Sequence, residues 1–139
     1  MSKTNILALD VGTKRVGVAL ARAAVRVPVA LETLDRQSPD FWDQLKKLTT
    51  EHGISQLIVG LPRGLNGQET AQTRDVITFA ERLKKQIALP IVWQDEALTS
   101  VKAESVLNNG KPYQKSQVDA LAACFILADY LEGEEVALL

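Results

Sequence analysis

The sequence predicts an α/β protein built on a mixed five-stranded sheet with helices on both faces. Three short apolar segments come first and are joined by brief connections, which is typical of an antiparallel meander. Helical periodicity then alternates with short buried runs, the pattern of parallel strands linked by helical crossovers. The chain has 139 residues, of which 46% are hydrophobic. This length suits one domain with a real core, so we expect a single domain over residues 1–139.

The first stretch to justify is residues 6–20, ILALDVGTKRVGVAL. Two apolar runs flank a Gly-Thr-Lys turn, which predicts two strands joined as a hairpin. Residues 26–34 alternate well enough for a third strand. Pro28 lacks a backbone donor and therefore predicts that this strand lies at the sheet edge.

The helices and the remaining strands follow in order. Ser38 and Pro39 predict a helix start, with Ser as the N-cap and Pro at the first helical position, and Gly53 predicts its end. Later segments comprise a buried strand over 54–60, a helix with the stripe Val76, Ala80, Leu83 and Ile87, a strand over 91–93, a short helix from Thr99 or Ser100 to Gly110, and a last helix from Ser116 to about Glu132 that packs on the sheet through Val118, Leu121, Ala122, Phe125 and Ile126. A meander followed by two crossovers is the ribonuclease H-like architecture.

The charge is unevenly distributed along the chain. The formal net charge is −1, yet residues 1–30 carry Lys3, Lys14, Arg15, Arg22 and Arg26 against Asp10 alone. This basic end could face a phosphate backbone, although charge alone favours the interpretation as a solvated mixed surface.

Targeting signals and membrane spans are not evident. No apolar run approaches the roughly 20 residues that cross a bilayer, and the N-terminus leads into a strand without a secretory segment. The single Cys124 cannot form an internal disulfide. We therefore expect a cytoplasmic protein with no membrane partner.

Acidic residues stand where a ligand site is expected. Asp10 ends a strand that reads as buried on both faces, where an uncompensated charge costs several kcal/mol by rough estimate. Asp95 and Glu96 end a second strand, and Asp119 lies in the first turn of the last helix. Ligands in open α/β sheets collect at the carboxyl ends of the central parallel strands, so these carboxylates are expected to converge.

Such a set of oxygen ligands suits a hard cation. Mg²⁺ and Mn²⁺ prefer carboxylates, whereas the lone His52 and the lone Cys124 offer little to zinc. Two ions about 3.5–4 Å apart would activate a water and stabilise the leaving oxygen of a phosphodiester.

Each acid also has a plainer interpretation. Asp10 could open a turn, because Asp is favoured at the first turn position. Asp119 completes a capping-box pattern with Ser116 and could serve only the helix start. Asp95 and Glu96 could be a solvated loop pair.

Other features have weaker functional interpretations. Glycines 60, 64 and 67 lack the ending of a P-loop, but backbone at the next helix N-terminus could approach a substrate phosphate, with Arg63 adding charge. Trp42 and Trp93 are expected in the core, although Trp93 could also stack on a base.

Four motifs together resemble the YqgF/RuvX family. They are Leu9 to Ala19 (LDVGTKRVGVA), Ile58 to Pro62 with Asn66-Gly67, Asp95-Glu96 with Leu98-Thr-Ser, and Lys115 to Ala120 with Ala122-Ala and Ile126-Leu. The resemblance covers nearly the whole chain, and the ordered set is specific where each motif alone is weak. It implies a ribonuclease H-like nuclease, with a role in maturing the 5′ end of pre-16S ribosomal RNA or, in an older proposal, in resolving Holliday junctions.

By matching position, the resemblance implies that Asp10, Glu96 and Asp119 form the acidic, Mg²⁺- or Mn²⁺-binding site, with Asp95 as an additional candidate ligand. Lys14 and Lys115 become candidate phosphate contacts, and Arg15 joins them as a candidate nucleic-acid contact. The family usually has Arg directly after Asp-Glu, where this chain has Ala97. Any substrate contact made by that Arg is either absent here or supplied elsewhere, with Arg63 and Lys102 as candidates.

The leading hypothesis is a metal-dependent nuclease that acts on structured RNA, with pre-rRNA favoured over a DNA junction and the ribosome as an additional partner. The alternatives are a junction resolvase, which would be a dimer, and a non-catalytic RNA- or ribosome-binding module on the same fold. ATP binding of the actin type shares the Asp-Val-Gly-Thr turn, but it needs two lobes and the chain is too short for them.

Overall fold

The computed structural model describes residues 5–64, 67–96 and 115–138. The elements are β1 (Asn5–Val11), β2 (Arg15–Ala21), β3 (Val29–Asp35), α1 (Phe41–Glu51), β4 (Ile54–Pro62), α2 (Ala71–Gln86), β5 (Ile91–Glu96) and α4 (Lys115–Leu138). The short helix predicted between residues 99 and 110 lies outside the described residues.

The sheet has the predicted mixed topology. Its five strands run in the order β3-β2-β1-β4-β5. β2 pairs antiparallel with β1 and β3, whereas β4 pairs parallel with β1 and β5. The prediction that the third strand lies at an edge is confirmed, and β1 stands in the centre because both crossovers return to the same side of it.

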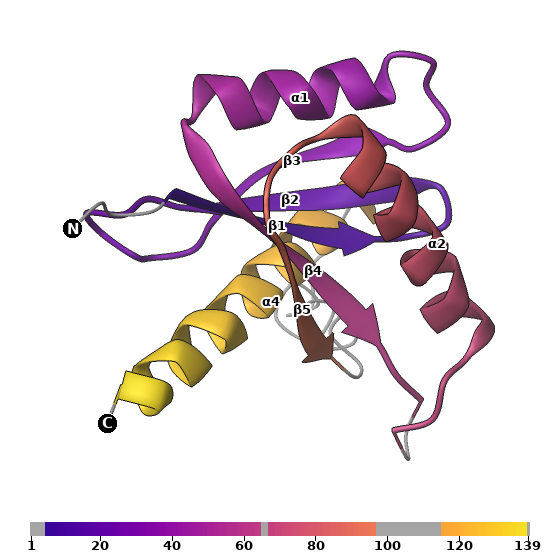
Figure 1. Ribbon diagram of the computed structural model, residues 1–139. Helices are drawn as coiled ribbons and strands as arrows, with labels where there is room; N and C mark the ends of the chain where they lie inside the picture. The colour runs from indigo at the N-terminus through magenta and orange to yellow at the C-terminus, as the bar shows by residue number, and fades with distance from the viewer. Residues whose placement is uncertain (1–4, 65–66, 97–114, 139) are drawn as a thin grey trace, which may run out of the picture.

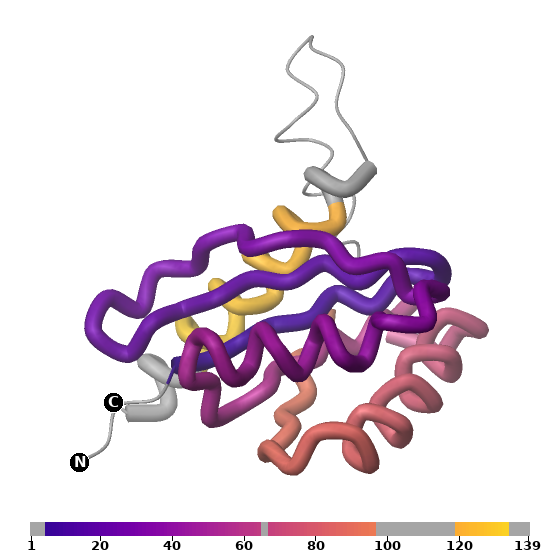
Figure 2. Tube along the Cα trace, turned by 90° about the horizontal axis from the view of Figure 1, so that it is seen from above, coloured from indigo at the N-terminus to yellow at the C-terminus, as the bar shows by residue number. Residues whose placement is uncertain are grey.

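Helices cover both faces of this sheet, as Figures 1 and 2 show. Side chains alternate between faces along each strand. Leu7 and Leu9 of β1 join the core cluster under α1 and α2, whereas Ile6 and Ala8 join the cluster under α4. The parity of a residue in β1 therefore decides which helix layer its side chain meets.

The first helix begins later than predicted. Ser38 does not cap it: the Ser38 hydroxyl accepts from the Asp40 amide at 3.2 Å and the Ser38 carbonyl accepts from the Phe41 amide at 3.1 Å, which closes a turn ahead of α1. Ser, Pro and Asp favour such a turn as much as a helix start. The predicted end is confirmed, since Gly53 adopts φ +56° just after the helix.

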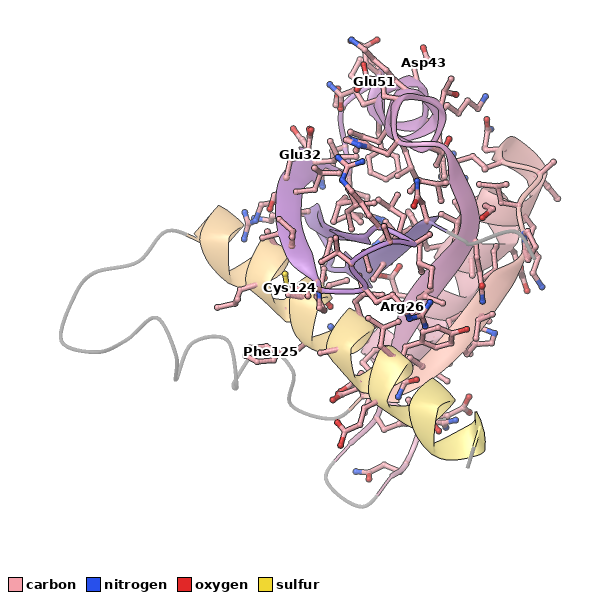
Figure 3. The ribbon with its side chains drawn as sticks, turned by 90° about the vertical axis from the view of Figure 1, so that its left-hand side faces the viewer. Arg26, Glu32, Asp43, Glu51, Cys124 and Phe125 are labelled. Carbon is pink, nitrogen blue, oxygen red and sulfur yellow. The ribbon has the colours of Figure 1, made fainter. Side chains whose placement is uncertain are left out.

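The last helix meets the sheet through a different stripe from the predicted one. Ala123, Leu127 and Leu131 pack on the sheet together with the predicted Ile126, whereas Leu121 and Phe125 form a separate small cluster with Ala122. Figure 3 shows Phe125 on the side of α4 away from the strands and Cys124 on the side toward them. Apolar residues surround this helix, so periodicity alone could not select the buried side.

The described helices include none that is both long and apolar enough to span a bilayer.

Candidate functional site

Asp10 lies in a strand and not in a turn. It belongs to β1 and pairs with Gly17 of β2, which excludes the interpretation of Asp10 as the first residue of a turn. Its even position puts its side chain on the same face as Ile6 and Ala8, toward α4. The carboxylate therefore leaves the sheet in the direction of the helix that carries Asp119.

Gly17 allows that helix to come close. A Cβ atom on Gly17 would lie 1.9 Å from the backbone oxygen of Asp119, so the α4 backbone rests directly on β2 at this point. No other residue type leaves this space. Because Gly17 is the partner of Asp10 across the hairpin, the close approach sets Asp119 beside Asp10.

The carboxylate of Asp119 is held by Arg15. The Arg15 Nε atom donates to Asp119 Oδ2 at 2.8 Å, and the Asp119 side chain is 19% exposed. Ser116 lies inside α4, which begins at Lys115, so it is not the cap of that helix. The capping-box interpretation of Asp119 is therefore wrong, and the described partner of this carboxylate is a cation from the start of β2.

The environment of Asp10 opposes its ionisation. Burial away from water, and then the negative charge of Asp119, raise the pKa of Asp10 from 3.8 to about 7. Two carboxylates that share a poorly hydrated site cannot both ionise freely unless a cation joins them. The pair is thus a place where positive charge is favoured.

A short turn connects these residues. The Gly12 amide donates to the Arg15 carbonyl at 2.8 Å, and a Cβ on Gly12 would lie 2.8 Å from that same oxygen. Lys14 is exposed at the tip of the turn. A surface depression beside it is lined by Lys14, Arg15, Thr33, Leu34, Asp35 and Gln37.

Glu96 lies on the correct face but farther along the sheet. It shares the even parity of Val92, which packs on the α4 side, and it is 7% exposed. The register Leu9↔Val59↔Trp93 puts Gln94 level with Asp10, so Glu96 lies two residues beyond it. With strands about 4.8 Å apart and a rise of about 3.3 Å per residue, the Cα atoms of Asp10 and Glu96 are about 12 Å apart.

Asp95 points elsewhere. Its odd parity directs it to the face of α1 and α2, and its side chain is 71% exposed. Arg63 Nε donates to Asp95 Oδ1 at 3.3 Å. The structure therefore separates Asp95 from Asp10, and the interpretation of Asp95 and Glu96 as one solvated loop pair is wrong because β5 splits them between two faces.

The described residues contain no group of three His, Cys, Asp or Glu side chains close enough to hold a metal ion. Asp10 and Asp119 meet, but Glu96 stands apart from them. The two that meet suit a hard divalent cation, because both donate oxygen and because the raised pKa of Asp10 marks a charge that lacks compensation. Glu96 as a third ligand stays a prediction.

The N-terminus of α2 is already capped. Thr70 accepts from the Thr73 amide at 3.2 Å, the Thr70 amide donates to the Thr73 hydroxyl at 3.0 Å, and that hydroxyl also donates to the Pro62 carbonyl. These contacts use the Thr70 and Thr73 amides, which are two of the backbone donors at this helix end. Binding of a substrate phosphate at this helix end stays a prediction, and Arg63, which was expected to add charge there, is paired with Asp95.

The candidates Lys102 and Lys115 have no described side chains, and neither does Ala97, which stands where the family usually has Arg. Lys102 and Ala97 lie outside the described residues, and Lys115 is described only as the first residue of α4. The two tryptophans differ: Trp42 stacks on Phe79 with ring centroids 5.3 Å apart, as expected of a core residue, whereas Trp93 is 38% exposed.

Sequence reasoning missed Arg36. Its guanidinium contacts the carbonyl of Gly12 at 2.9 Å and the carboxylate of Asp75 at 2.7 Å, and so joins the turn after Asp10 to α2. The residue follows β3 in a segment with no recognisable motif, so only the folded arrangement reveals it.

Known proteins place these features in a family. The family model described as "RuvX: Holliday junction resolvase" matches residues 4–133. The chain belongs to the RuvX family. A protein of Chloroflexus aurantiacus named "Putative pre-16S rRNA nuclease" is 40% identical over 137 residues, which cover 96% of this chain and 90% of that protein. A protein of Crocosphaera subtropica with the same name is 39% identical over 143 residues, which cover 100% of each chain.

A solved structure supports the fold of this RuvX family member. "T. thermophilus RuvC in complex with Holliday junction substrate" aligns with a TM-score of 0.52 at 14% identity and covers 94% of this chain and 96% of that one. At this identity the likeness shows the fold alone. The predicted family and the ribonuclease H-like fold are confirmed, and the names of the relatives agree with the predicted nuclease activity.

Proposed function

We propose that this chain is a divalent-metal-dependent nuclease that matures the 5′ end of pre-16S ribosomal RNA in the cytoplasm. The proposal takes residues 1–139 as one nuclease domain, with structured RNA as the substrate and the ribosome as a further partner. The observation that carries it is the pairing of Asp10 with Asp119, two carboxylates brought together at the carboxyl end of β1 by the close approach at Gly17. The names of the relatives favour pre-rRNA among the substrates of such a site.

Each residue of the site would have a separate role in metal binding or substrate binding. Asp10 and Asp119 would hold Mg²⁺ or Mn²⁺, with Glu96 as the proposed third ligand. The bound cation would activate water and stabilise the leaving oxygen of the phosphodiester. Arg15 orients the Asp119 carboxylate through its 2.8 Å contact. Lys14, which is exposed on the same turn, would contact the phosphate backbone.

The test compares cleavage of a 5′-extended pre-rRNA by the wild type with cleavage by Asp10→Asn and Asp119→Asn. Both substitutions keep the side-chain shape and remove the charge, so we expect the rate to fall by at least about a hundredfold, as for loss of a group that acts in the transition state. Asp43→Asn on the exposed side of α1 is the matched control and should cleave normally. Equal rates in the wild type and in both site variants would refute the proposal.

A Holliday junction resolvase is the second candidate, favoured by the description of the family model that matches this chain. It predicts that a four-way DNA junction is cut faster than pre-rRNA in a side-by-side assay. It also predicts a dimer, because two symmetric strands must be cut. A monomer at working concentration that cleaves only RNA would exclude it.

A non-catalytic binding module on the same fold is the third candidate. It predicts that no divalent cation binds near Asp10. Titration with Mn²⁺ decides this, because a bound paramagnetic ion would broaden the NMR signals of Leu9, Asp10 and Val11 in the wild type and not in Asp10→Asn. Selective broadening in the wild type would exclude the module.

A further inference from the structure

Arg36 connects three parts of the chain that the sequence keeps apart. Its backbone amide donates to the Lys14 carbonyl at 2.9 Å, which fastens the segment after β3 to the turn between β1 and β2. Its guanidinium Nη1 donates to the Gly12 carbonyl at 2.9 Å on the same turn. One residue therefore holds both ends of the stretch Gly12 to Lys14.

The same guanidinium is anchored on α2. Nη1 donates to Asp75 Oδ2 at 2.7 Å and Nη2 donates to Asp75 Oδ1 at 3.0 Å, a two-bond arrangement that fixes the plane of the group. The hydrogen bond from Arg36 lowers the pKa of Asp75 below 3.8, so the carboxylate stays charged at neutral pH. The guanidinium carbon also lies 5.1 Å from the ring centroid of Phe79, and the Arg36 side chain is 20% exposed.

The turn leads directly to the candidate site. The Gly12 amide closes the turn on the Arg15 carbonyl at 2.8 Å, and the Arg15 side chain then reaches Asp119 on α4. Polar contacts thus run without a break from α2 on one face of the sheet, around the end of the hairpin, to α4 on the other face. The position from which Arg15 contacts Asp119 depends on the conformation of the turn. Arg36 stabilises that conformation through its hydrogen bonds to the turn backbone.

We propose that Arg36 is a positioning residue, which holds the Gly12–Arg15 turn against Asp75 of α2 and thereby sets the contact between Arg15 and Asp119. Its guanidinium is needed for geometry: it serves the Gly12 carbonyl and both oxygens of Asp75 together, which a lysine ammonium cannot do in one plane. This inference extends the proposed nuclease function, but its first test needs neither metal nor substrate.

The variants are Arg36→Met, which keeps the packing stem and removes the hydrogen bonds, and Arg36→Lys, which keeps the charge. The matched control is Arg82→Met. Arg82 lies 5.7 Å from the ring centroid of Trp42, which stacks on Phe79, so it touches the same aromatic group. Arg82 contacts that ring and not the turn, so the loss of its side chain reports on stability alone.

The readouts are amide hydrogen exchange at Gly12 and the NMR signal of the Arg15 Nε–H group, with Asp119→Asn as the reference for its loss. Loss of a hydrogen bond to a charged group should speed exchange at Gly12 by about tenfold in Arg36→Met. The Arg15 signal should move toward that of Asp119→Asn, and Arg36→Lys should behave like Arg36→Met. Arg82→Met should leave both signals in place even if it lowers the melting temperature.

Equal exchange at Gly12 in Arg36→Met and Arg82→Met, or an unmoved Arg15 signal, would overturn the proposal. The cleavage assay adds an independent arm: Arg36→Met should lower kcat more than Arg82→Met does. If the wild type cleaves no substrate, the proposed function fails, and the exchange comparison still decides the role of Arg36.

Discussion

Replacing Asp10 by Asn tests the cost of burying this carboxylate. Burial, followed by the charge of Asp119, raises the pKa of Asp10 from 3.8 to about 7. Between pH 3.8 and about pH 7, the Asp10 carboxyl keeps a proton in the native protein that it has lost in the unfolded chain. The free energy of unfolding therefore falls as the pH rises through this range. Above pH 7 both states are ionised and the full cost is present. Below pH 3.8 both are neutral and the cost disappears.

The magnitude follows from the pKa. At 1.36 kcal/mol per pH unit, a rise from 3.8 to about 7 corresponds to about 4 kcal/mol, of which about 3 kcal/mol develops between pH 5 and pH 8. Asn has the shape of Asp without its charge. Asp10→Asn should therefore become more stable relative to the wild type by about 3 kcal/mol over this range.

The assay is urea unfolding followed by tryptophan fluorescence at pH 5 and pH 8, in EDTA and at constant ionic strength. Asp43→Asn, on the exposed side of α1, is the control and should give the same difference from wild type at both pH values. The reasoning is refuted if the gap in unfolding free energy between Asp10→Asn and wild type is the same at pH 5 and pH 8. The reasoning is also refuted if the free energy of unfolding of the wild type rises relative to that of Asp10→Asn as the pH increases.

Three further predictions follow from the same contacts. Gly17→Ala puts a Cβ atom against the Asp119 backbone and should lower the free energy of unfolding in chemical denaturation by about 3 kcal/mol or more. Gly133→Ala, whose added Cβ would have nothing within 4 Å, should raise it by about 0.5–1 kcal/mol. Equal effects of the two substitutions would contradict the close approach at Gly17. Mn²⁺ at pH 8 should raise the melting temperature of the wild type and leave that of Asp10→Asn unchanged, and an equal rise in both would place the ion elsewhere. Thr73→Val removes one half of the α2 capping box and should lower the free energy of unfolding by about 1–2 kcal/mol. Thr78→Val, on the exposed side of the same helix, is the control and should lower it by less. A larger loss of stability in Thr78→Val than in Thr73→Val would contradict the role of the cap.

Strand order and the placement of Asp10 could be predicted from local pattern. Two apolar runs around a Gly-Thr-Lys turn specify a hairpin, and a helical crossover specifies a parallel neighbour. Asp10 is an acidic residue within an apolar stretch of sequence. The structure places it in the buried strand β1, where its pKa is raised. These inferences needed only alternation along the chain and the cost of a buried charge.

Registers and helix faces could not be predicted in this way. Strand alternation predicts the sheet face on which Glu96 lies but not its position along the strand relative to Asp10. The observed register puts Gln94, and not Glu96, level with Asp10. The pairing of Asp95 with Arg63 joins two segments 32 residues apart, which no local pattern records. The buried side of α4 was misjudged for a related reason: a helix apolar all round gives no stripe, and packing on Gly17 decides its orientation.

Gly17 also explains why the first motif behaves as one unit. Asp10 and Gly17 are cross-strand partners, so the space that Gly17 leaves is directly beside the carboxylate. The α4 backbone fills that space at Asp119, and Arg15, two residues before Gly17, points to the same helix and takes its carboxylate. The motif therefore supplies an acid, the room for a second acid and the cation that orients it. A substitution that keeps Asp10 and removes Gly17 should disable the site as completely as loss of the acid itself, because the partner carboxylate would no longer reach it.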